Sequence, residues 1–200
     1  MALIEMDSLT KVFKKDFSKK KVLALNSLTL QVQEGEVFGF LGPNGAGKST
    51  TIKLLLNLIR PTSGNLSIDG KNVADKTVRG MIGYLPENPY FYDHLSAEEP
   101  LWFGGKSCNL DNTAIRQRTT TLLTDLDLID AMKRPLRSYS KGMVQRAGLA
   151  LALIHDPKIL ILDEPMSGLD PMGRKKVFEL ILTLKKEGKT VFFSSHILHD

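Results

Sequence analysis

The chain has 200 residues, a formal net charge of +5 at pH 7 and 42% hydrophobic residues, which is the composition of a globular protein with one sizeable core. No apolar run approaches the roughly 20 residues that a membrane-spanning helix needs, so a role at a membrane would be exerted from the aqueous side. The single cysteine, Cys108, excludes an internal disulfide and is compatible with a reducing cytosol.

The N-terminal segment contains two strand-like runs, at residues 3–9 and 22–32, which predict a small and largely antiparallel sheet. Between them lies a lysine-rich stretch, for which a solvated loop is favoured over a surface for anionic lipid or nucleic acid. Aromatic residues are not interleaved through it, so no nucleic acid partner is expected. Phe13 is our choice for a ring that stacks on adenine, with Phe17 as second choice, although packing within the small sheet explains either residue equally well.

A glycine-rich segment follows the apolar run 36–41 and precedes a mostly apolar helix predicted for residues 51–59. It has the phosphate-loop pattern, in which backbone N–H groups and a helix N-terminus bind the phosphates of a nucleoside triphosphate. Lys48 is expected to reach the β- and γ-phosphates, and the Ser49 hydroxyl to bind Mg²⁺. An incidental glycine-rich turn is the disfavoured alternative. The predicted nucleotide-binding residues are Gly42, Pro43, Asn44, Gly45, Ala46, Gly47, Lys48, Ser49 and Thr50.

The next apolar strand, predicted at residues 81–85, ends on a stiff polar loop that contains Glu87. A carboxylate at a strand end near a phosphate site is a candidate ligand for a metal ion or water. From residue 90 to residue 154 the patterns are helical, and a break is expected at Pro100 and at Gly104-Gly105. Ser140 is placed to cap the apolar helix that follows it, whose start is a further candidate anion site.

Four consecutive aliphatic residues, 159–162, then end on Asp163 and Glu164. Because successive side chains of a strand face opposite ways, the two carboxylates can have different functions: Asp163 on the metal, usually through water, and Glu164 on the attacking water. A pair that merely caps a loop is the alternative. A further buried strand, residues 190–196, ends on His196, for which we favour contact with the γ-phosphate over a structural role.

These motifs, in this order, closely resemble those of the ATP-binding cassette (ABC) family, the nucleotide-binding subunits of ABC transporters, over nearly the whole chain. Residues 84–87 stand at the Q-loop position, 139–143 at the signature, 159–164 at Walker B and 167–170 at the D-loop, and His196 is the switch histidine. Glu87 replaces the usual Gln, and Lys141 and Met143 replace a Gly and a Gln of the signature. These variants resemble exporter-type (ABC-2-like) cassettes that work with a separate permease.

The resemblance implies an α/β fold with a P-loop NTPase core (RecA-like, mostly parallel sheet), a small antiparallel β subdomain and an inserted α-helical subdomain. Residues 1–89 and 155–200 would form the core with the β subdomain, and residues 90–154 the helical subdomain. It also implies that ATP and Mg²⁺ lie in a head-to-tail dimer, expected to be a homodimer. In that dimer Ser140 and Gly142 of one chain contact the γ-phosphate held by the other.

The implied function is ATP hydrolysis that drives export through a membrane permease, with the subunit peripheral on the cytoplasmic face of the cell membrane. Glu164 and His196 are then the catalytic residues, and Ser49, Glu87 and Asp163 are the Mg²⁺ ligands. The alternative is a soluble ABC-type ATPase that acts on ribosomes or nucleic acid, but the chain has no room for a coiled-coil insertion and no second cassette. Because relatives continue with further elements, we expect the chain to be truncated at its C-terminal end.

Overall fold

A computed structural model describes residues 2–14 and 21–196 of the chain, which form two sheets of four strands each. The antiparallel sheet has the order β2-β1-β4-β5, with strands Lys21–Gln33, Ala2–Lys14, Ser63–Ile68 and Lys71–Asn72. The parallel sheet has the order β3-β8-β7-β6, with strands Val37–Leu41, Thr190–Ser195, Ile159–Leu162 and Ile82–Leu85. The expected α/β fold with one parallel and one antiparallel sheet is confirmed.

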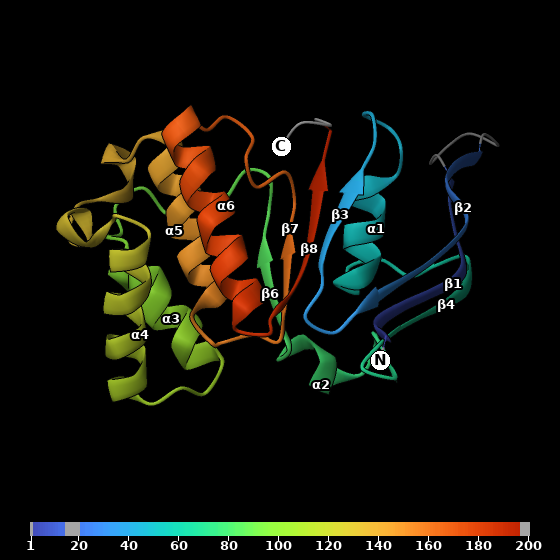
Figure 1. Ribbon diagram of the computed structural model, residues 1–200, viewed down its shortest axis with the longest axis horizontal. Helices are drawn as coiled ribbons and strands as arrows, with labels where there is room; N and C mark the ends of the chain where they lie inside the picture. Colours follow the sequence, from blue (N-terminus) through green and yellow to red (C-terminus); the bar gives the residue numbers. More distant parts are fainter. Residues whose placement is uncertain (1, 15–20, 197–200) are drawn as a thin grey trace.

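The helices divide between the two faces of the parallel sheet (Figure 1). On one face, α1 (Lys48–Leu55) lies between the parallel and the antiparallel sheet. On the other face lie α5 (Lys141–Leu153) and α6 (Pro171–Lys186), with α3 (Glu98–Ser107) and α4 (Asn112–Asp125) beyond α5. The short helices are α2 (Lys76–Arg79), η1 (Ile129–Ala131) and η2 (Leu136–Ser138). Within the described residues, no helix is both long enough and apolar enough to span a bilayer.

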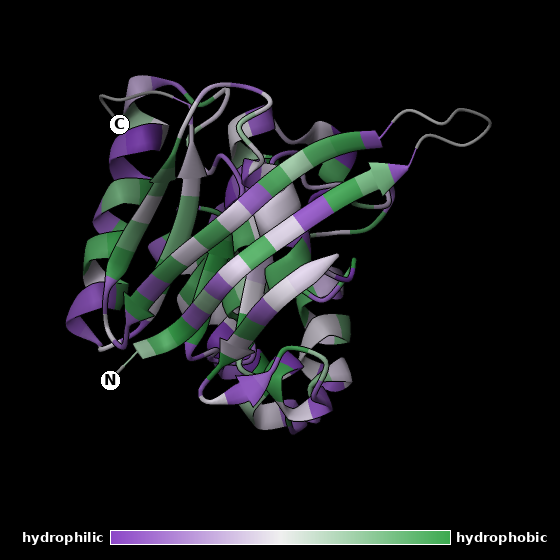
Figure 2. Ribbon diagram, turned by 90° about the vertical axis from the view of Figure 1, so that its right-hand side faces the viewer, coloured by the Kyte–Doolittle hydropathy of each residue, from purple (hydrophilic) through white to green (hydrophobic). Residues whose placement is uncertain are grey.

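The antiparallel sheet follows the alternation of its sequence, which Figure 2 shows as bands of differing hydropathy along β1 and β2. Ile4 and Met6 of β1 are buried, and they pair with Val32 and Leu30 of β2. One face of this sheet therefore covers α1 while the other meets solvent, as is usual for antiparallel sheets.

The aliphatic run of β7 contributes to two separate hydrophobic clusters. Ile159 and Ile161 pack in the cluster that includes α1 and the antiparallel sheet, whereas Leu160 and Leu162 pack in the cluster that includes α5 and α6. Because successive strand residues face opposite sides of the sheet, a strand between two helical layers must be apolar at every position. This position inside the core holds the end of β7, where the carboxylates follow, in a fixed place.

The predicted helix break at Pro100 and Gly104-Gly105 is wrong, because α3 runs without interruption through all three residues. Pro100 is the third residue of α3, in the first turn, where backbone N–H groups have no partner within the helix and a proline is tolerated. The two glycines serve close packing instead. A Cβ at Gly104 would lie 2.6 Å from Leu151 Cδ1, and one at Gly105 would lie 2.6 Å from Ile115 Cγ1.

Candidate functional site

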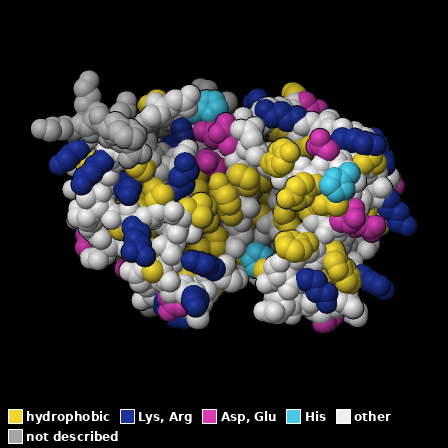
Figure 3. Space-filling view, turned by 180° about the vertical axis from the view of Figure 1, so that it is seen from behind, with side chains coloured by type: hydrophobic (Ala, Val, Ile, Leu, Met, Phe, Trp, Pro, Cys, Tyr) yellow, Lys and Arg dark blue, Asp and Glu magenta, His cyan; other side chains and the backbone are white. Residues whose placement is uncertain are grey.

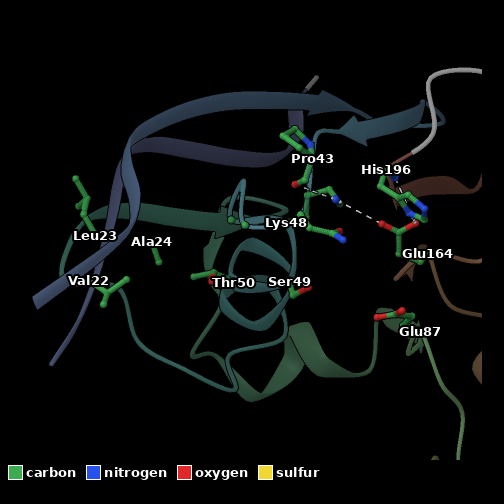
Figure 4. A pocket seen from close by; sticks show the side chains of 13 residues that line it. Val22, Leu23, Ala24, Pro43, Lys48, Ser49, Thr50, Glu87, Glu164 and His196 are labelled. Atoms are coloured by element: carbon green, nitrogen blue, oxygen red, sulfur yellow. Dashed lines mark hydrogen bonds and ion pairs between the residues drawn. The ribbon is translucent and has the colours of Figure 1, made fainter. Parts of the chain in front are cut away.

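A cavity of about 320 Å³ lies where the carboxyl ends of the parallel strands meet the start of α1 (Figure 4). The β3 strand leads into the glycine-rich loop, and β7 and β8 lead into Glu164 and His196. Parallel register brings these ends together, since Leu41 of β3 pairs with Ser195 of β8, and Leu162 of β7 pairs with Phe193 of β8. The cavity is lined by Val22, Leu23, Ala24, Pro43, Asn44, Gly45, Gly47, Lys48, Ser49, Thr50, Glu87, Glu164 and His196.

The loop between β3 and α1 curls tightly over the start of the helix. The Ala46 N–H donates to the Pro43 carbonyl oxygen at 3.1 Å, and Gly45 and Gly47 adopt φ angles of 86° and 90°. Gly47 occupies the N-cap of α1 and provides no side-chain cap for the first turn. The N–H groups at this helix end are therefore available to an anion, and the helix dipole adds to the attraction.

Lys48 is 7% exposed, and its ammonium group contacts three oxygens, two from the loop and one from Glu164. Nζ donates to the carbonyl oxygens of Gly42 and Pro43 at 2.6 and 3.4 Å and lies 3.5 Å from Glu164 Oε1. A buried cation requires such partners, and phosphate oxygens entering the loop would satisfy the same ammonium group.

Glu164 joins the end of β7 to the end of β8. Its side chain is 11% exposed, and Oε2 lies 2.7 Å from His196 Nδ1 and accepts from the His196 backbone N–H at 3.3 Å. Glu164 itself has a φ of 49°, a left-handed conformation that non-glycine residues rarely adopt outside turns and functional sites. One carboxylate thus contacts the phosphate-loop lysine through one oxygen and the strand-end histidine through the other.

Asp163 takes the opposite direction from Glu164, as expected for neighbours at a strand end. It is 8% exposed, does not line the cavity, and accepts a hydrogen bond from Ser194 Oγ at 2.7 Å through Oδ1. The hydroxyl of Tyr84 is also affected: burial raises its pKa, and the charge of Asp163 adds to that shift. Asp163 is therefore a largely buried carboxyl group that follows the same strand as Glu164 but does not line the cavity.

The predicted magnesium ligands are distributed around the cavity rather than gathered into one cluster. Ser49 and Glu87 line it, whereas Asp163 is buried and does not line it. Among the described residues no group of three or more His, Cys, Asp or Glu side chains could hold a metal ion by itself. This donor set fits Mg²⁺ that arrives with a nucleotide, because Mg²⁺ is commonly held by one or two carboxylates, water and substrate phosphates.

The signature residues lie away from this cavity in the same chain. Ser140 is the N-cap of α5, its Oγ accepts from the Met143 N–H at 3.2 Å, and Gly142 lies close to Leu169. The predicted capping function of Ser140 is confirmed. Neither Ser140 nor Gly142 lines the cavity, so one chain does not bring its phosphate loop and its signature together.

Phe13, the residue predicted to stack on adenine, lies at the C-terminal end of β1. Phe13 is 38% exposed, its ring is covered by the Lys11 ammonium group at 5.0 Å, and it does not line the cavity. Its pairing partner on β2, Val22, does line the cavity together with Leu23 and Ala24. The sequence did not identify these three residues as part of the site, because the alternation of polar and apolar residues in β2 does not indicate which of them face the phosphate loop. Phe17 lies outside the described residues.

Comparison with known proteins gives a consistent result. Residues 25–167 match the family model described as ABC transporter. An ABC transporter ATP-binding protein of Synechocystis is 48% identical over 204 residues, covering 99% of this chain and 57% of that relative. The lantibiotic transport ATP-binding protein SrtF of Streptococcus pyogenes is 38% identical over 187 residues, covering 94% of this chain and 79% of the relative.

A solved structure shows the same likeness in three dimensions. The dimeric, post-hydrolysis state of the ATP-binding cassette MJ0796, bound to ADP and Pi, has a TM-score of 0.85 at 27% identity. The match covers 98% of this chain and 88% of that one. The chain spans about six tenths of the length of several curated relatives that match it along most of its sequence.

Proposed function

The chain belongs to the ABC transporter family, and we propose that it binds and hydrolyses ATP to drive export through a separate membrane permease. The observation that carries this proposal is the meeting of Lys48, Glu164 and His196 at one cavity beside the glycine-rich loop. A phosphate-binding lysine, a carboxylate and a strand-end histidine within contact distance are the groups that phosphoryl transfer to water requires.

In the proposed reaction the triphosphate lies along the loop from Gly42 to Thr50. Lys48 then exchanges its carbonyl partners for β- and γ-phosphate oxygens, which frees Glu164 from the ion pair. The attacking water forms a bond to the γ-phosphorus and gives its proton to Glu164, while the bond between the γ-phosphorus and the β–γ bridging oxygen breaks and ADP leaves. His196 orients Glu164 and contacts the γ-phosphate. We assign Ser49, Glu87 and Asp163 as the residues that would hold Mg²⁺, directly or through water; the ion would neutralise charge on the phosphates.

The site requires a second cassette in this proposal. Ser140 and Gly142 do not line the cavity, and the related cassette MJ0796 is dimeric in its solved structure. We propose a head-to-tail homodimer in which Ser140 and Gly142 of one chain contact the γ-phosphate bound by the other. The division into a core of residues 1–89 and 155–200 and a helical subdomain of residues 90–154 belongs to the same proposal.

A second cavity, of about 740 Å³ and mostly apolar, supports a permease as the partner. Figure 3 shows hydrophobic side chains gathered around a hollow on the back of the molecule. Tyr90, Tyr92 and Phe103 at this cavity are 86%, 68% and 74% exposed, and aromatic residues of this kind are enriched where partners bind. We propose that the permease docks here, next to Glu87, and holds the subunit at the cytoplasmic face of the membrane.

The hydrolytic function is tested in the whole protein by Glu164→Gln. The variant is expected to keep ATP affinity but to lose roughly 100-fold or more in kcat, because it lacks the proton acceptor. Glu179→Gln makes the same chemical change on the exposed surface of α6 and is expected to leave kcat unchanged. Hydrolysis at the parent rate by Glu164→Gln would contradict the assignment.

The transport function is tested by purification from membranes. An integral membrane protein is expected to copurify with the subunit, and Phe103→Asp is expected to lose it while retaining ATP binding. Recovery with ribosomes or DNA, and with no membrane protein, would contradict the proposal in favour of a soluble ABC ATPase.

A further inference from the structure

We propose that Ser194 is a positioning residue of the hydrolytic site, because its single hydroxyl holds both carboxylate residues at the end of β7. The inference rests on the proposed ATPase function and adds a residue that neither the phosphate loop nor the strand-end pattern identifies. Ser194 lies on β8, two residues before His196, and is completely buried.

The hydroxyl of Ser194 makes two hydrogen bonds at once. Oγ donates to Asp163 Oδ1 at 2.7 Å and accepts from the Glu164 backbone N–H at 3.0 Å. A serine hydroxyl has one proton and two lone pairs, so the proton is committed to Asp163 and a lone pair to Glu164. The hydrogen bond from Ser194 fixes the orientation of the Asp163 carboxylate. Because the same hydroxyl also binds the backbone of Glu164, it couples the orientation of Asp163 to the position of Glu164.

The bond to the Glu164 N–H acts at a strained position. With a φ of 49°, Glu164 turns the chain sharply out of β7, and this turn sends its side chain toward Lys48 and His196 while Asp163 points to Ser194. Strained conformations of this kind persist only where the surroundings hold them. The Ser194 hydroxyl is a partner that ties this turn to the neighbouring strand.

Removing the hydroxyl would leave the Glu164 N–H without this acceptor and Asp163 without this donor. Mutation of a residue that does not bind the metal itself but orients a metal ligand typically lowers metal affinity or activity by about 10- to 100-fold. A displacement of about 1 Å at a reacting group has effects of similar size. Ser194→Ala is therefore expected to reduce kcat by about 10- to 100-fold and to raise the Mg²⁺ concentration for half-maximal rate, with KM for ATP changed less than about threefold.

A matched control exists on the same strand. Thr190 is also completely buried, and its Oγ1 accepts from the Gly35 backbone N–H at 2.8 Å at the opposite end of β8. Thr190→Val removes a hydroxyl of the same kind, in the same strand, without touching Asp163 or Glu164. It is expected to lower stability much as Ser194→Ala does, but to leave kcat and the Mg²⁺ dependence unchanged.

The first measurement uses the nucleotide-free protein. Residue-resolved amide hydrogen exchange is expected to be at least about tenfold faster at Glu164 in Ser194→Ala, with Gly35 unchanged, and the reverse is expected in Thr190→Val. The second measurement compares kcat, KM and Mg²⁺ dependence in the same variants. If Ser194→Ala does not fold, Ser194→Cys replaces it, since the thiol preserves the volume but is a weak donor and acceptor.

The outcomes separate the two proposals. A parent protein without ATPase activity contradicts the proposed function, and the amide exchange of Glu164 then decides the positioning role alone. An active parent with a Ser194 variant that keeps both the parent kcat and slow exchange at Glu164 overturns the inference about Ser194 only. Equal losses of kcat in Ser194→Ala and Thr190→Val would also overturn it, because they would reflect stability rather than position.

Discussion

Replacing Gly47 with alanine is expected to weaken nucleotide binding far more than the same change at Gly45, although both residues belong to the phosphate loop. Both have a left-handed backbone, with φ angles of 90° and 86°, which costs an alanine about 1 to 2 kcal/mol. Their surroundings differ. A Cβ at Gly47 would lie 2.7 Å from both the Ala24 carbonyl oxygen and Leu25 Cδ2, whereas a Cβ at Gly45 would have no neighbour within 4 Å.

The magnitude follows from these contacts. A separation of 2.7 Å from a backbone oxygen forces the loop or β2 to move, and overpacking of this kind costs about 1 to 3 kcal/mol. The total is about 2 to 5 kcal/mol at Gly47 and about 1 to 2 kcal/mol at Gly45, because only Gly47 has the overpacking cost. With this cost on the loop conformation that binds ATP, affinity for ATP falls about five- to 30-fold at Gly45. At Gly47 it falls by a further factor of about five to 140, because 1.4 kcal/mol is about a factor of ten.

The assay is calorimetric titration of each folded variant with ATP, after thermal unfolding has shown that it is folded. Gly188→Ala is the control, since Gly188 has a φ of 79° and no neighbour near its Cβ and lies in the turn before β8. It is expected to lose stability without loss of affinity. Equal losses of affinity at Gly45 and Gly47 would contradict this prediction. They would mean that the contact of β2 with Gly47 does not limit the conformation of the phosphate loop.

Three further predictions concern other parts of the molecule. Ser140→Arg is expected to block ATP-dependent dimerisation while leaving ATP binding to the monomer intact, and dimer formation in light scattering would contradict the proposed contact. Tyr139→Phe removes a buried hydroxyl that donates to the Ala131 carbonyl oxygen at 2.8 Å, so urea unfolding should show a loss of about 1 to 2 kcal/mol. Burial holds the pKa of His155 in the folded protein below its ordinary value. The stability that the neutral imidazole contributes is therefore fully present above the pKa of the unfolded chain, and it is lost as the pH falls through the pKa of the folded protein. Acidification should therefore destabilise the parent more than His155→Gln, and equal acid sensitivity in urea titrations would refute this.

Local patterns in the sequence were sufficient for most of the elements and for the edge at which the site forms. The glycine spacing before Lys48, the aliphatic run before Asp163 and the strand before His196 are each contained within a few residues. A parallel sheet aligns the carboxyl ends of its strands, so three such patterns predict one common site. The same reasoning failed at Pro100, where tolerance in the first turn of a helix outweighed the usual meaning of proline.

The contacts within the site depended on the register between distant strands, which local patterns do not contain. Ser194 meets Asp163 and Glu164 because β8 pairs with β7, and the approach of Ala24 to Gly47 results from the position of β2 beside the loop.

The sequence by itself determined the phosphate loop and the carboxylates at the end of β7, because these follow from periodicity and spacing; the fold class followed from the family that the ordered motifs resemble. Only the tertiary structure decided that Glu164 contacts both Lys48 and His196, with one carboxylate oxygen for each. It also decided that Asp163 is buried and does not line the cavity, and that Val22 rather than Phe13 lines it. The physical reason is that side-chain direction at a strand end is set by the packing of neighbouring strands and by a single strained φ angle, not by the order of residues.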